Sequence, residues 1–533
     1  MNKKIFFVGG ISLLIILVLY YFALPPINLS SPAFWEFILM IFIIIIMDYT
    51  FIKGITVAKK KRITLDDFKP YKTFIIIGGI FLLLIPIINF IASPIFNAKE
   101  YSERIIVDET HEFTKDVKPV DFSKIPLLDK ESSEKLGDRK MGEATSWVSQ
   151  FYVSDLYTQI NYNEDIIRVT PIEYSGLIKY FTNRDEGIKG YISVNSVDGK
   201  ARLNKIEKGM KYMPSAYFFE NLNRKLRLEY PTTIFDKPSF EIDNDGNPYW
   251  IVPVVKYKAI GLKKEISGAV IFNPINGESK KYKLKDIPSW VDHVFAADLI
   301  IEQLDNWGEY RNGFINSIFG QKDVINTTEG YNYLVMDDDV YLYTGITSVS
   351  SDESNLGFVL VNLRTKETNY YSAPGAEEYS AMASAEGLVQ EKKYKASFPL
   401  LINLNNKPTY LLSLKDNAGL VKMYAFIDVE DYQKVVVSDA SLGIKVAAEK
   451  YLGDNVKINT QKVLEKEIII SNITSAIIDG NTSYYIVDDN GNLYTVSIKV
   501  NKNLLPFLIK GDKVNISYNE GEISQIVSIT KGE

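Results

Sequence analysis

Three long apolar runs open the chain, before any alternation of apolar and polar residues begins. They are Ile5 to Ala23, Phe34 to Ile52 and Thr73 to Ala92. An α-helix needs about 20 residues to cross about 30 Å of hydrocarbon, and each run is close to that length. A cleaved signal peptide would also follow basic residues such as Lys3 and Lys4, but no small-residue cleavage site comes after the first run. We therefore predict a three-helix transmembrane anchor over residues 1–97.

The loops between the predicted spans differ in charge. The first loop, Leu24 to Ala33, carries none. Basic residues follow the second span, at Lys53, Lys59, Lys60, Lys61, Arg62, Lys69 and Lys72. Because basic loops stay in the cytoplasm, we predict a multi-pass protein of the cell membrane with a cytoplasmic N-terminus and with everything after about residue 98 extracellular. The Lys59 to Arg62 cluster is also a candidate site for anionic lipid or for a cytoplasmic partner.

Polar and small residues interrupt the predicted spans. Asp48 lies near the end of the second run, beside Tyr49, where its carboxylate can reach the headgroups. A functional carboxylate inside the membrane is the alternative interpretation. Gly78, Gly79 and Pro86 in the third run permit close helix contact or a kink. These features favour a small helix bundle.

A short pattern recurs beyond the anchor. Its three clear copies are GYISVNSVDG (Gly190 to Gly199), GAVIFNPING (Gly268 to Gly277) and GFVLVNLRTKE (Gly357 to Glu367). An Asn stands five residues after each leading Gly, at Asn195, Asn273 and Asn362. A turn follows each Asn, although Lys366 replaces the turn glycine in the third copy. GLVKMYAFIDVEDY (Gly419 to Tyr432) is a fourth, weaker copy, so the pattern indicates tandem units of one fold.

Each copy reads as a helix followed by antiparallel strands. Ser239 to Leu284 shows the strands best, because the turn Asp243 to Pro248 separates an apolar strand from an aromatic one. The predicted helices are Ser215 to Glu229, Ser289 to Asn306 and Glu377 to Gln390. A helix that covers one face of such a sheet makes a two-layer α+β unit. Units of about 60 to 90 residues are marginal alone, so we expect neighbouring units to pack together.

The α-β-β-β unit whose last strand ends in an Asn/Asp-x-x-x-Gly turn resembles the PepSY type of cystatin-like domain. YISVNSVDGKARL and AVIFNPINGESKKYKL carry this resemblance, which covers Phe151 to about Val437. The resemblance implies non-catalytic extracytoplasmic modules, which sometimes inhibit or regulate a peptidase. The whole layout is also similar to that of uncharacterised multi-span membrane proteins of Gram-positive bacteria.

The predicted fold class is α+β, with seven parts along the chain. They are the transmembrane anchor 1–97, a polar juxtamembrane connector 98–145, PepSY-like units 1 to 4 at 146–210, 211–288, 289–374 and 375–462, and a C-terminal OB-like β-barrel at 463–533. Short strands separated by turns such as Asp489-Asn490-Gly491 and Lys510-Gly511-Asp512 indicate the barrel. The barrel lacks a dense basic and aromatic stripe for oligonucleotides or sugars, so a structural or docking role is favoured.

The composition argues against several chemistries. The chain has no Cys, only two His and a net charge of -6, which disfavour thiolate and zinc chemistry and a nucleic-acid partner. No Gly-x-Ser-x-Gly or phosphate-binding loop occurs, and neither His111 nor His293 has a triad context. We predict no catalytic residue, no cofactor-binding residue and no metal site.

Clustered charged residues are the remaining candidates, and each has a simpler interpretation. Asp243, Asp245 and Asn247 around Gly246 imitate the start of a calcium loop, but a hairpin turn is favoured because no later Glu follows. Asp337-Asp338-Asp339 reads as a solvated turn or a cation site. Asp352-Glu353 and Glu377-Glu378 suit a charged loop and a first helical turn better than a glycosidase pair. Lys415-Asp416-Asn417 reads as a strand connection or a binding loop.

Together these features predict a non-catalytic binding, scaffolding or regulatory protein of the bacterial envelope. Its expected partners are membrane lipid and an envelope or membrane protein, and the chain is a candidate homo-oligomer. Two alternatives stay open. One is a carboxylate-dependent hydrolase of cell-wall glycan, and the other is an accessory subunit of a membrane transport complex that works through the spans and Asp48.

Overall fold

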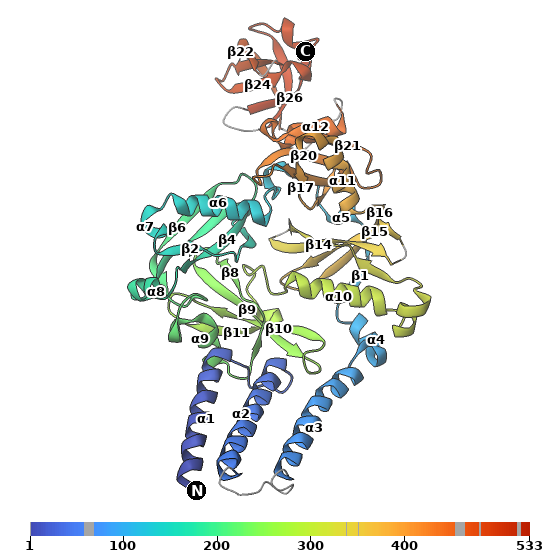
Figure 1. The fold of residues 1–533 in the computed structure, drawn as a ribbon. Coiled ribbons are helices and arrows are strands. Elements are labelled where there is room, and N and C mark those ends of the chain that lie inside the picture. The colour runs from blue at the N-terminus through green and yellow to red at the C-terminus, as the bar shows by residue number, and fades with distance from the viewer. Residues whose placement is uncertain are drawn as a thin grey trace.

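The computed structural model describes residues 2–57, 69–336, 338–349, 351–453, 464–478, 481–519 and 524–532. Helices α1 (Asn2–Ala23), α2 (Pro32–Val57) and α3 (Lys69–Ile91) lie side by side at one end of the molecule (Figure 1). Only Pro32–Ile52 is by itself long and apolar enough to cross a membrane. Gly78–Ile91 passes only together with α4 (Pro94–Ser102), to which it is bent by 51°. The described residues thus contain one candidate span, or two with the bent pair, and not the three predicted.

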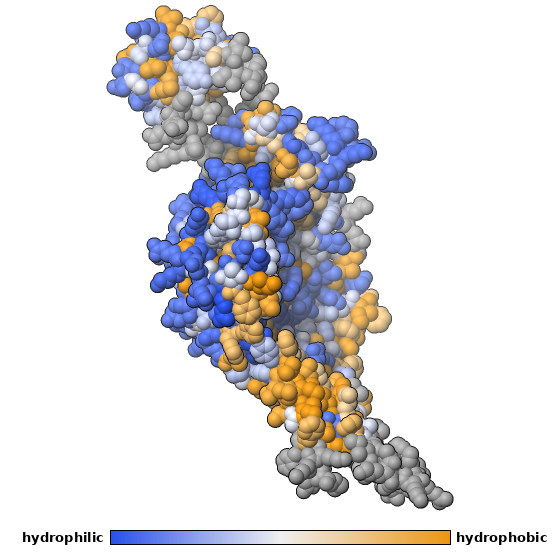
Figure 2. Space-filling view, turned by 60° about the vertical axis from the view of Figure 1, so that its left-hand side comes forward, coloured by the Kyte–Doolittle hydropathy of each residue, from blue (hydrophilic) through white to orange (hydrophobic). Residues whose placement is uncertain are grey.

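Among the residues whose side chains are described, the apolar part of α1 is Phe7–Ala23, which is shorter than a candidate span must be. The helices still contact one another. Ser12 donates a hydrogen bond to Asp48 over 2.8 Å, and a Cβ on Gly78 would lie 3.2 Å from the Phe42 ring. The glycine therefore permits the close contact expected of the third run. Apolar side chains cover the outside of these helices, which form the hydrophobic (orange) region near the lower end of the molecule in Figure 2.

Four sheets follow, and their strands are arranged alike. In each sheet the first two strands are short, and both pair with the same edge of the long third strand, one after the other along its length. Unit 1 contains β2 (Phe151–Val153), β3 (Thr158–Tyr162), β4 (Asp165–Tyr174), β5 (Ile188–Asn195) and β6 (Ala201–Met210). Unit 2 contains β7 (Ile234–Phe235), β8 (Ser239–Ile242), β9 (Pro248–Tyr257), β10 (Lys264–Phe272) and β11 (Ser279–Lys283). Unit 3 contains β12 (Ile325–Thr327), β13 (Asn332–Met336), β14 (Asp339–Ser348), β15 (Ser351–Asn362) and β16 (Thr368–Ala376). Unit 4 contains β17 (Lys395–Ala396), β18 (Leu400–Leu404), β19 (Lys407–Lys415), β20 (Val421–Asp428) and β21 (Val435–Asp439).

Capping side chains and contacts with other units decide where the helices of the connector and the units begin. They are α6 (Lys130–Gly142), α7 (Thr145–Val148), α8 (Leu177–Asn183), α9 (Leu222–Glu229), α10 (Ala297–Tyr310), α11 (Glu378–Leu388) and α12 (Ile444–Leu452). The helix predicted from Ser289 begins only at Ala297, because the N–H groups of Val294 and Phe295 donate to the Leu363 carbonyl. The helix predicted from Ser215 begins at Leu222, where Asn221 accepts from the Arg224 N–H.

The recurring Gly and Asn have the same geometry in the three clear copies. Each leading glycine lies where the strand register shifts, and a Cβ there would fall 2.0–2.6 Å from the carbonyl oxygen of the residue 14 positions later. Each Asn side chain accepts two backbone N–H groups of the following turn. In unit 4 Asp428 takes this role. The recurring residues therefore reflect the backbone of each unit: the strand bulge leaves no room for a Cβ at the glycine, and the turn needs the acceptor of the Asn side chain.

Neighbouring units share hydrophobic cores, as the marginal size of one unit requires. The shared cores join Val169 to Trp250 between units 1 and 2, Ile251 to Leu342 between units 2 and 3, and Phe358 to Phe426 between units 3 and 4. Pairwise sharing makes the four units one continuous array.

The connector packs against the units as well as linking them to the anchor. Its strand β1 (Val107–His111) pairs in parallel with β16, and α5 (Phe113–Asp116) follows beside unit 4 (Figure 1). Ile105, Phe113 and Met141 each enter a different one of the three shared cores. The apolar residues of this segment lack a period because each one fills a separate core rather than one helix or strand face.

The C-terminal strands close into a barrel in the order β22-β23-β24-β26-β25. They are β22 (Leu464–Ile478), β23 (Asn481–Asp488), β24 (Leu493–Ser497), β25 (Lys513–Asn519) and β26 (Ser524–Lys531). The barrel has its own core, built around Ile486, Val496 and Val514. The OB-like identity of the barrel stays a prediction.

Candidate functional site

The second short strand of each unit points toward the middle of the molecule. β3, β8, β13 and β18 each pair with one neighbour only, so each leaves an edge of its sheet uncovered. β3 contacts both β8 and β14, and β13 contacts β18. Equivalent strands of four units therefore converge, and cavities lie between them.

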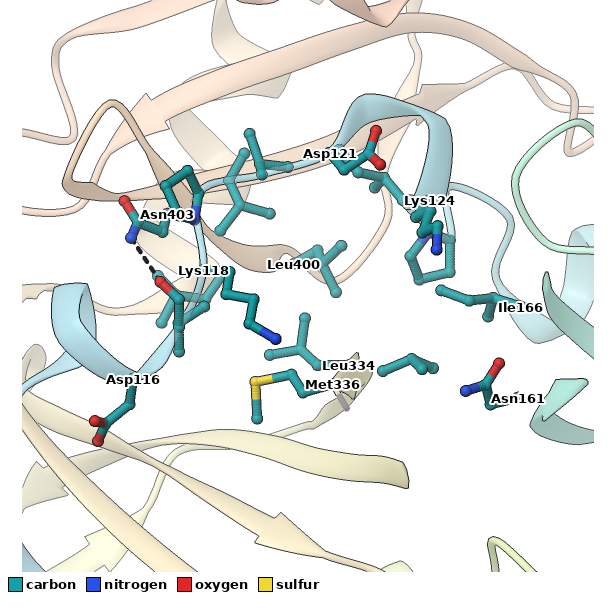
Figure 3. Close-up of a pocket in the computed structure, with 18 of the residues that line it drawn as sticks. Asp116, Lys118, Asp121, Lys124, Asn161, Ile166, Leu334, Met336, Leu400 and Asn403 are labelled. Atoms are coloured by element: carbon teal, nitrogen blue, oxygen red, sulfur yellow. Dashed lines mark hydrogen bonds between the residues drawn. The ribbon is translucent and has the colours of Figure 1, made fainter. Parts of the chain in front are cut away.

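The larger cavity, here the central cavity, has a volume of about 730 Å³ and lies between the connector and units 1, 3 and 4. Its apolar wall includes Ile166 of unit 1, Leu334 and Met336 of β13, and Leu400 of β18. Figure 3 shows Lys118 of the connector extending between these side chains. The volume lies within the range of ligand-binding pockets, and the wall combines apolar with polar side chains.

Charged and amide groups surround the central cavity. Lys124 of the connector donates to Glu164 of unit 1 over 2.9 Å, and this pair lowers the pKa of Glu164. Asn161 of β3 donates to Asp338 of unit 3 over 2.9 Å. The first bond joins the connector to unit 1 and the second joins unit 1 to unit 3, between residues that line the cavity. They therefore hold its shape and supply polar groups beside an apolar floor.

The edge of β18 supplies backbone groups to the central cavity. The Asn403 carbonyl accepts from the Val120 N–H of the connector over 2.9 Å, so the connector covers this end of the strand. Backbone groups alternate in direction along an antiparallel strand, so those of Leu401 point to the same side as those of Asn403. No backbone bond outside the sheets joins Leu401 to another described residue. This part of the strand edge lines the central cavity and has no partner among the described strands, although every residue of β18 is buried.

A buried polar cluster lies behind the cavity, where units 1, 2 and 3 meet. Glu241 is fully buried and accepts from the N–H groups of Asp292 and His293, while Asp292 accepts from the Asn161 N–H. Burial raises the pKa of both carboxyls, and their mutual repulsion contributes at Asp292. Both carboxyls are buried and neither is among the residues that line the central cavity, so these two acids belong to the junction between the units.

The two histidines have unrelated settings and form no triad. His293 Nε2 lies 2.6 Å from the Gln159 carbonyl, which can only accept, so Nε2 carries the proton. Burial lowers the pKa of His293 to about 4, so the ring is neutral at pH 7. His111 instead contacts Asp116 and Asp108, and the hydrogen bond to Asp116 raises its pKa.

The carboxylates of the predicted acidic turns already accept hydrogen bonds from nearby residues. Asp243 accepts from the N–H groups of Asp245 and Asn247, as a hairpin turn requires. Asp339 accepts two bonds from the Arg364 guanidinium. Asp337 and the side chains of Asp352, Glu353 and the Lys59 to Arg62 cluster lie outside the described residues. Within the described part no group of three or more His, Asp or Glu side chains is arranged to hold a metal ion.

Two predicted charged sites lie inside the fold instead of on its surface. Glu378 is fully buried at the start of α11 and accepts from the hydroxyl of Tyr343 and from Asn355. Lys415 is also buried and donates to Asp129, at the N-terminus of α6. Neither residue contributes to the central cavity. Glu378 lies in the first turn of α11, as predicted, and its side chain is buried there.

Sequence patterns missed the residues that line the central cavity, because most are ordinary apolar residues from distant segments. Arg168, in the buried and mostly apolar strand DIIRVTPIEY, lines a second cavity and was missed as well. A charged residue inside such a strand was the available signal. The chain matches no protein-family model and no curated protein.

Proposed function

We propose that this chain is a membrane-anchored binding protein of the bacterial envelope, and that an extended polypeptide segment of an envelope partner binds in the central cavity. The observation that carries the proposal is the cavity of about 730 Å³ between the connector and units 1, 3 and 4, which the edge of β18 without a described strand partner lines in part. Backbone bonds to such an edge supply affinity, and pockets for alternate side chains supply specificity. Catalysis is not part of the proposal.

The position of the anchor supports a location outside the cytoplasmic membrane. The loop between α1 and α2 is bonded to unit 2, since the Ile27 N–H donates to Pro231 and the Gly261 N–H donates to Ser30. The ends of α2 and α3 that flank the basic cluster, Val57 and Lys69, lie at the opposite end of the bundle (Figure 1). With basic loops in the cytoplasm, the four units would lie outside.

Exposed apolar residues beside the anchor also support contact with lipid. Ile178, Phe181, Phe218 and Phe219 have exposed fractions of 46–77%. Arg224 joins this group to α1, because its guanidinium donates to the Phe218 carbonyl and lies 3.9 Å from the centre of the Tyr21 ring. Such a patch next to membrane helices suits the headgroup region.

PepSY-like units and an OB-like barrel belong to the same proposal. The repeated turn and the helix-plus-sheet plan of units 1 to 4 support the first identity. The barrel supports the second, because its third and fifth strands pair in parallel and its fourth returns to its first. The hydrolase alternative has less support, since Glu241 and Asp292 are buried.

Photo-crosslinking in intact membranes tests the proposed cavity. A crosslinking amino acid at Lys124, on the cavity rim, is expected to capture one partner protein, whereas the same group at Tyr432 on the outer surface of unit 4 is not. Met336→Trp should block the cavity and abolish the Lys124 crosslink. Equal capture from both positions, or a Lys124 crosslink that survives Met336→Trp, would show that the partner binds elsewhere.

A further inference from the structure

A second cavity, here the side cavity, lies between the connector and units 1 to 4 and has a volume of about 560 Å³. Arg168 and Gln159 of unit 1 line it, together with Lys237 of unit 2 and Asp298, Tyr333 and Phe398 from units 3 and 4. The side cavity shares no lining residue with the central cavity. A ligand could therefore bind in the side cavity whether or not the central cavity is occupied, which goes beyond the proposed function.

Arg168 is the unusual member of this wall. It lies on the central strand β4 with 5% of its surface exposed. No hydrogen bond or ion pair joins its guanidinium to another side chain or backbone group in the described parts of the chain, and its Nε is buried without an acceptor. A buried guanidinium costs several kcal/mol of folding free energy unless an acceptor compensates it. A bound anion would compensate this cost.

The nearby acids are already engaged. Asp129 accepts from Lys415 and from the Ser132 N–H at the start of α6. Glu134 lies 3.5 Å from Lys130. Neither acid forms an ion pair with Arg168, so each acts on its charge only from a distance.

Further donors face the same space. Gln159 stands opposite Arg168 in the strand register, and its Nε2 is buried without an acceptor. The N-terminus of the 14-residue helix α10 also borders the side cavity, and its N-cap residue, Ala296, has no side chain that can cap it. Helix N-termini attract anions because their first N–H groups lack partners. A buried cation, an amide and a helix N-terminus therefore converge.

The charge balance of the side cavity selects the ligand class. Lys130 forms an ion pair with Glu134, and Asp129 forms one with Lys415. The remaining charged residues of the wall are two cations, Arg168 and Lys237, and one anion, Asp298. One net positive charge fits a carboxylate better than a phosphate dianion. Tyr333, Phe398 and two prolines supply apolar wall for the body of the ligand.

We propose that the side cavity binds a monocarboxylate with an apolar body, such as the end of a peptide, and that Arg168 holds the carboxylate. The planar guanidinium presents two parallel N–H donors, which match the two oxygens of a carboxylate. Gln159 and the N-terminus of α10 orient the same group.

Binding of simple probes to the full chain in detergent micelles tests this assignment. N-acetylphenylalanine is expected to bind about tenfold to a hundredfold more tightly than its neutral amide, which differs only at the carboxylate. Inorganic phosphate should not bind saturably. Ligand-observed NMR titrations measure all three probes, and this comparison needs no variant. Weaker binding of the acid than of the amide or of phosphate would overturn the ligand class.

Arg168→Met separates a ligand-binding arginine from a structural one. The variant should lose at least about tenfold in affinity for N-acetylphenylalanine and should unfold at a higher temperature without ligand, because an uncompensated buried charge is removed. Arg202→Met, on the exposed side of unit 1, is the matched control and should change neither quantity. A lower unfolding temperature with unchanged probe affinity would make Arg168 structural and overturn the proposal.

Discussion

The two histidines respond to protons in opposite directions. His293 is desolvated between three units, and its pKa falls to about 4, so the folded chain binds fewer protons there than the unfolded chain between pH 6.5 and 4. Stability from this site is therefore complete above pH 6.5 and is lost as the pH falls toward 4. At His111 the bond to Asp116 raises the pKa, so its contribution is present at low pH and is lost as the pH rises through the raised value.

His293→Gln should remove this loss of stability on acidification, because glutamine can still donate to the Gln159 carbonyl and does not titrate. Between pH 6.5 and 4 the wild type should lose about 3 kcal/mol of unfolding free energy relative to the variant. His111→Gln is the control, and it should not remove the loss. Unfolding in urea at a series of pH values measures the difference. Parallel pH profiles for wild type and His293→Gln would refute the desolvated histidine.

Gly268 tests the repeated strand bulge at the level of one Cβ. Gly268→Ala would place a methyl group 2.0 Å from the Tyr282 carbonyl oxygen, so β10 and β11 must separate. We expect a loss of about 2 kcal/mol or more of unfolding free energy. Gly387→Ala in α11 meets no atom within 4 Å and should be neutral or slightly stabilising. Thermal unfolding of both variants in detergent compares them, and equal effects would contradict the bulge argument.

The connector ties elements together that are distant in the sequence. Arg104, nearly buried, donates to Glu265 and Glu302 and to the Lys264 carbonyl, directly after the last helix of the anchor. Lys366 of unit 3 donates to the Arg104 carbonyl. The anchor is therefore fixed to units 2 and 3 by one buried guanidinium and its neighbours.

Arg104→Met should loosen this joint, because it leaves Glu265 and a backbone carbonyl with fewer donors. We expect a loss of about 3 kcal/mol, at the lower end for a broken buried pair because Glu302 is half exposed. Limited proteolysis should then cut first between the anchor and β1. Lys115→Met removes an exposed pair with Glu112 in the same connector and should have no effect. Equal protease resistance of Arg104→Met and wild type would contradict this joint.

Sequence patterns predicted regular elements far better than their contacts. The recurring Gly and Asn could be found because the same backbone constraint imposes them in each unit. The start of α10 could not, since Val294 and Phe295 are held by a carbonyl some 70 residues away in unit 3. The cavities were also out of reach, because residues such as Leu334 and Leu400 read as plain strand core until four edge strands converge.

At the scale of the whole molecule, the shared cores make units 1 to 4 one cooperative body and leave the barrel apart. A chain that ends after residue 462 lacks only the barrel core, so its thermal unfolding should match that of the same units in the full chain. A chain that ends after residue 374 loses half of the core around Phe358 and Phe426 and should aggregate or be degraded. Independent folding of the shorter chain would contradict the shared core.

The central claim is that units 1 to 4 lie outside the membrane and hold a partner in the central cavity. Because the chain has no native cysteine, single replacements report accessibility without background. In wall-stripped intact cells, a membrane-impermeant maleimide should label Met336→Cys and Tyr432→Cys, while an excess of the crosslinked partner should protect only Met336→Cys. Labelling of both positions only after lysis would place the units inside the cell and contradict the claim.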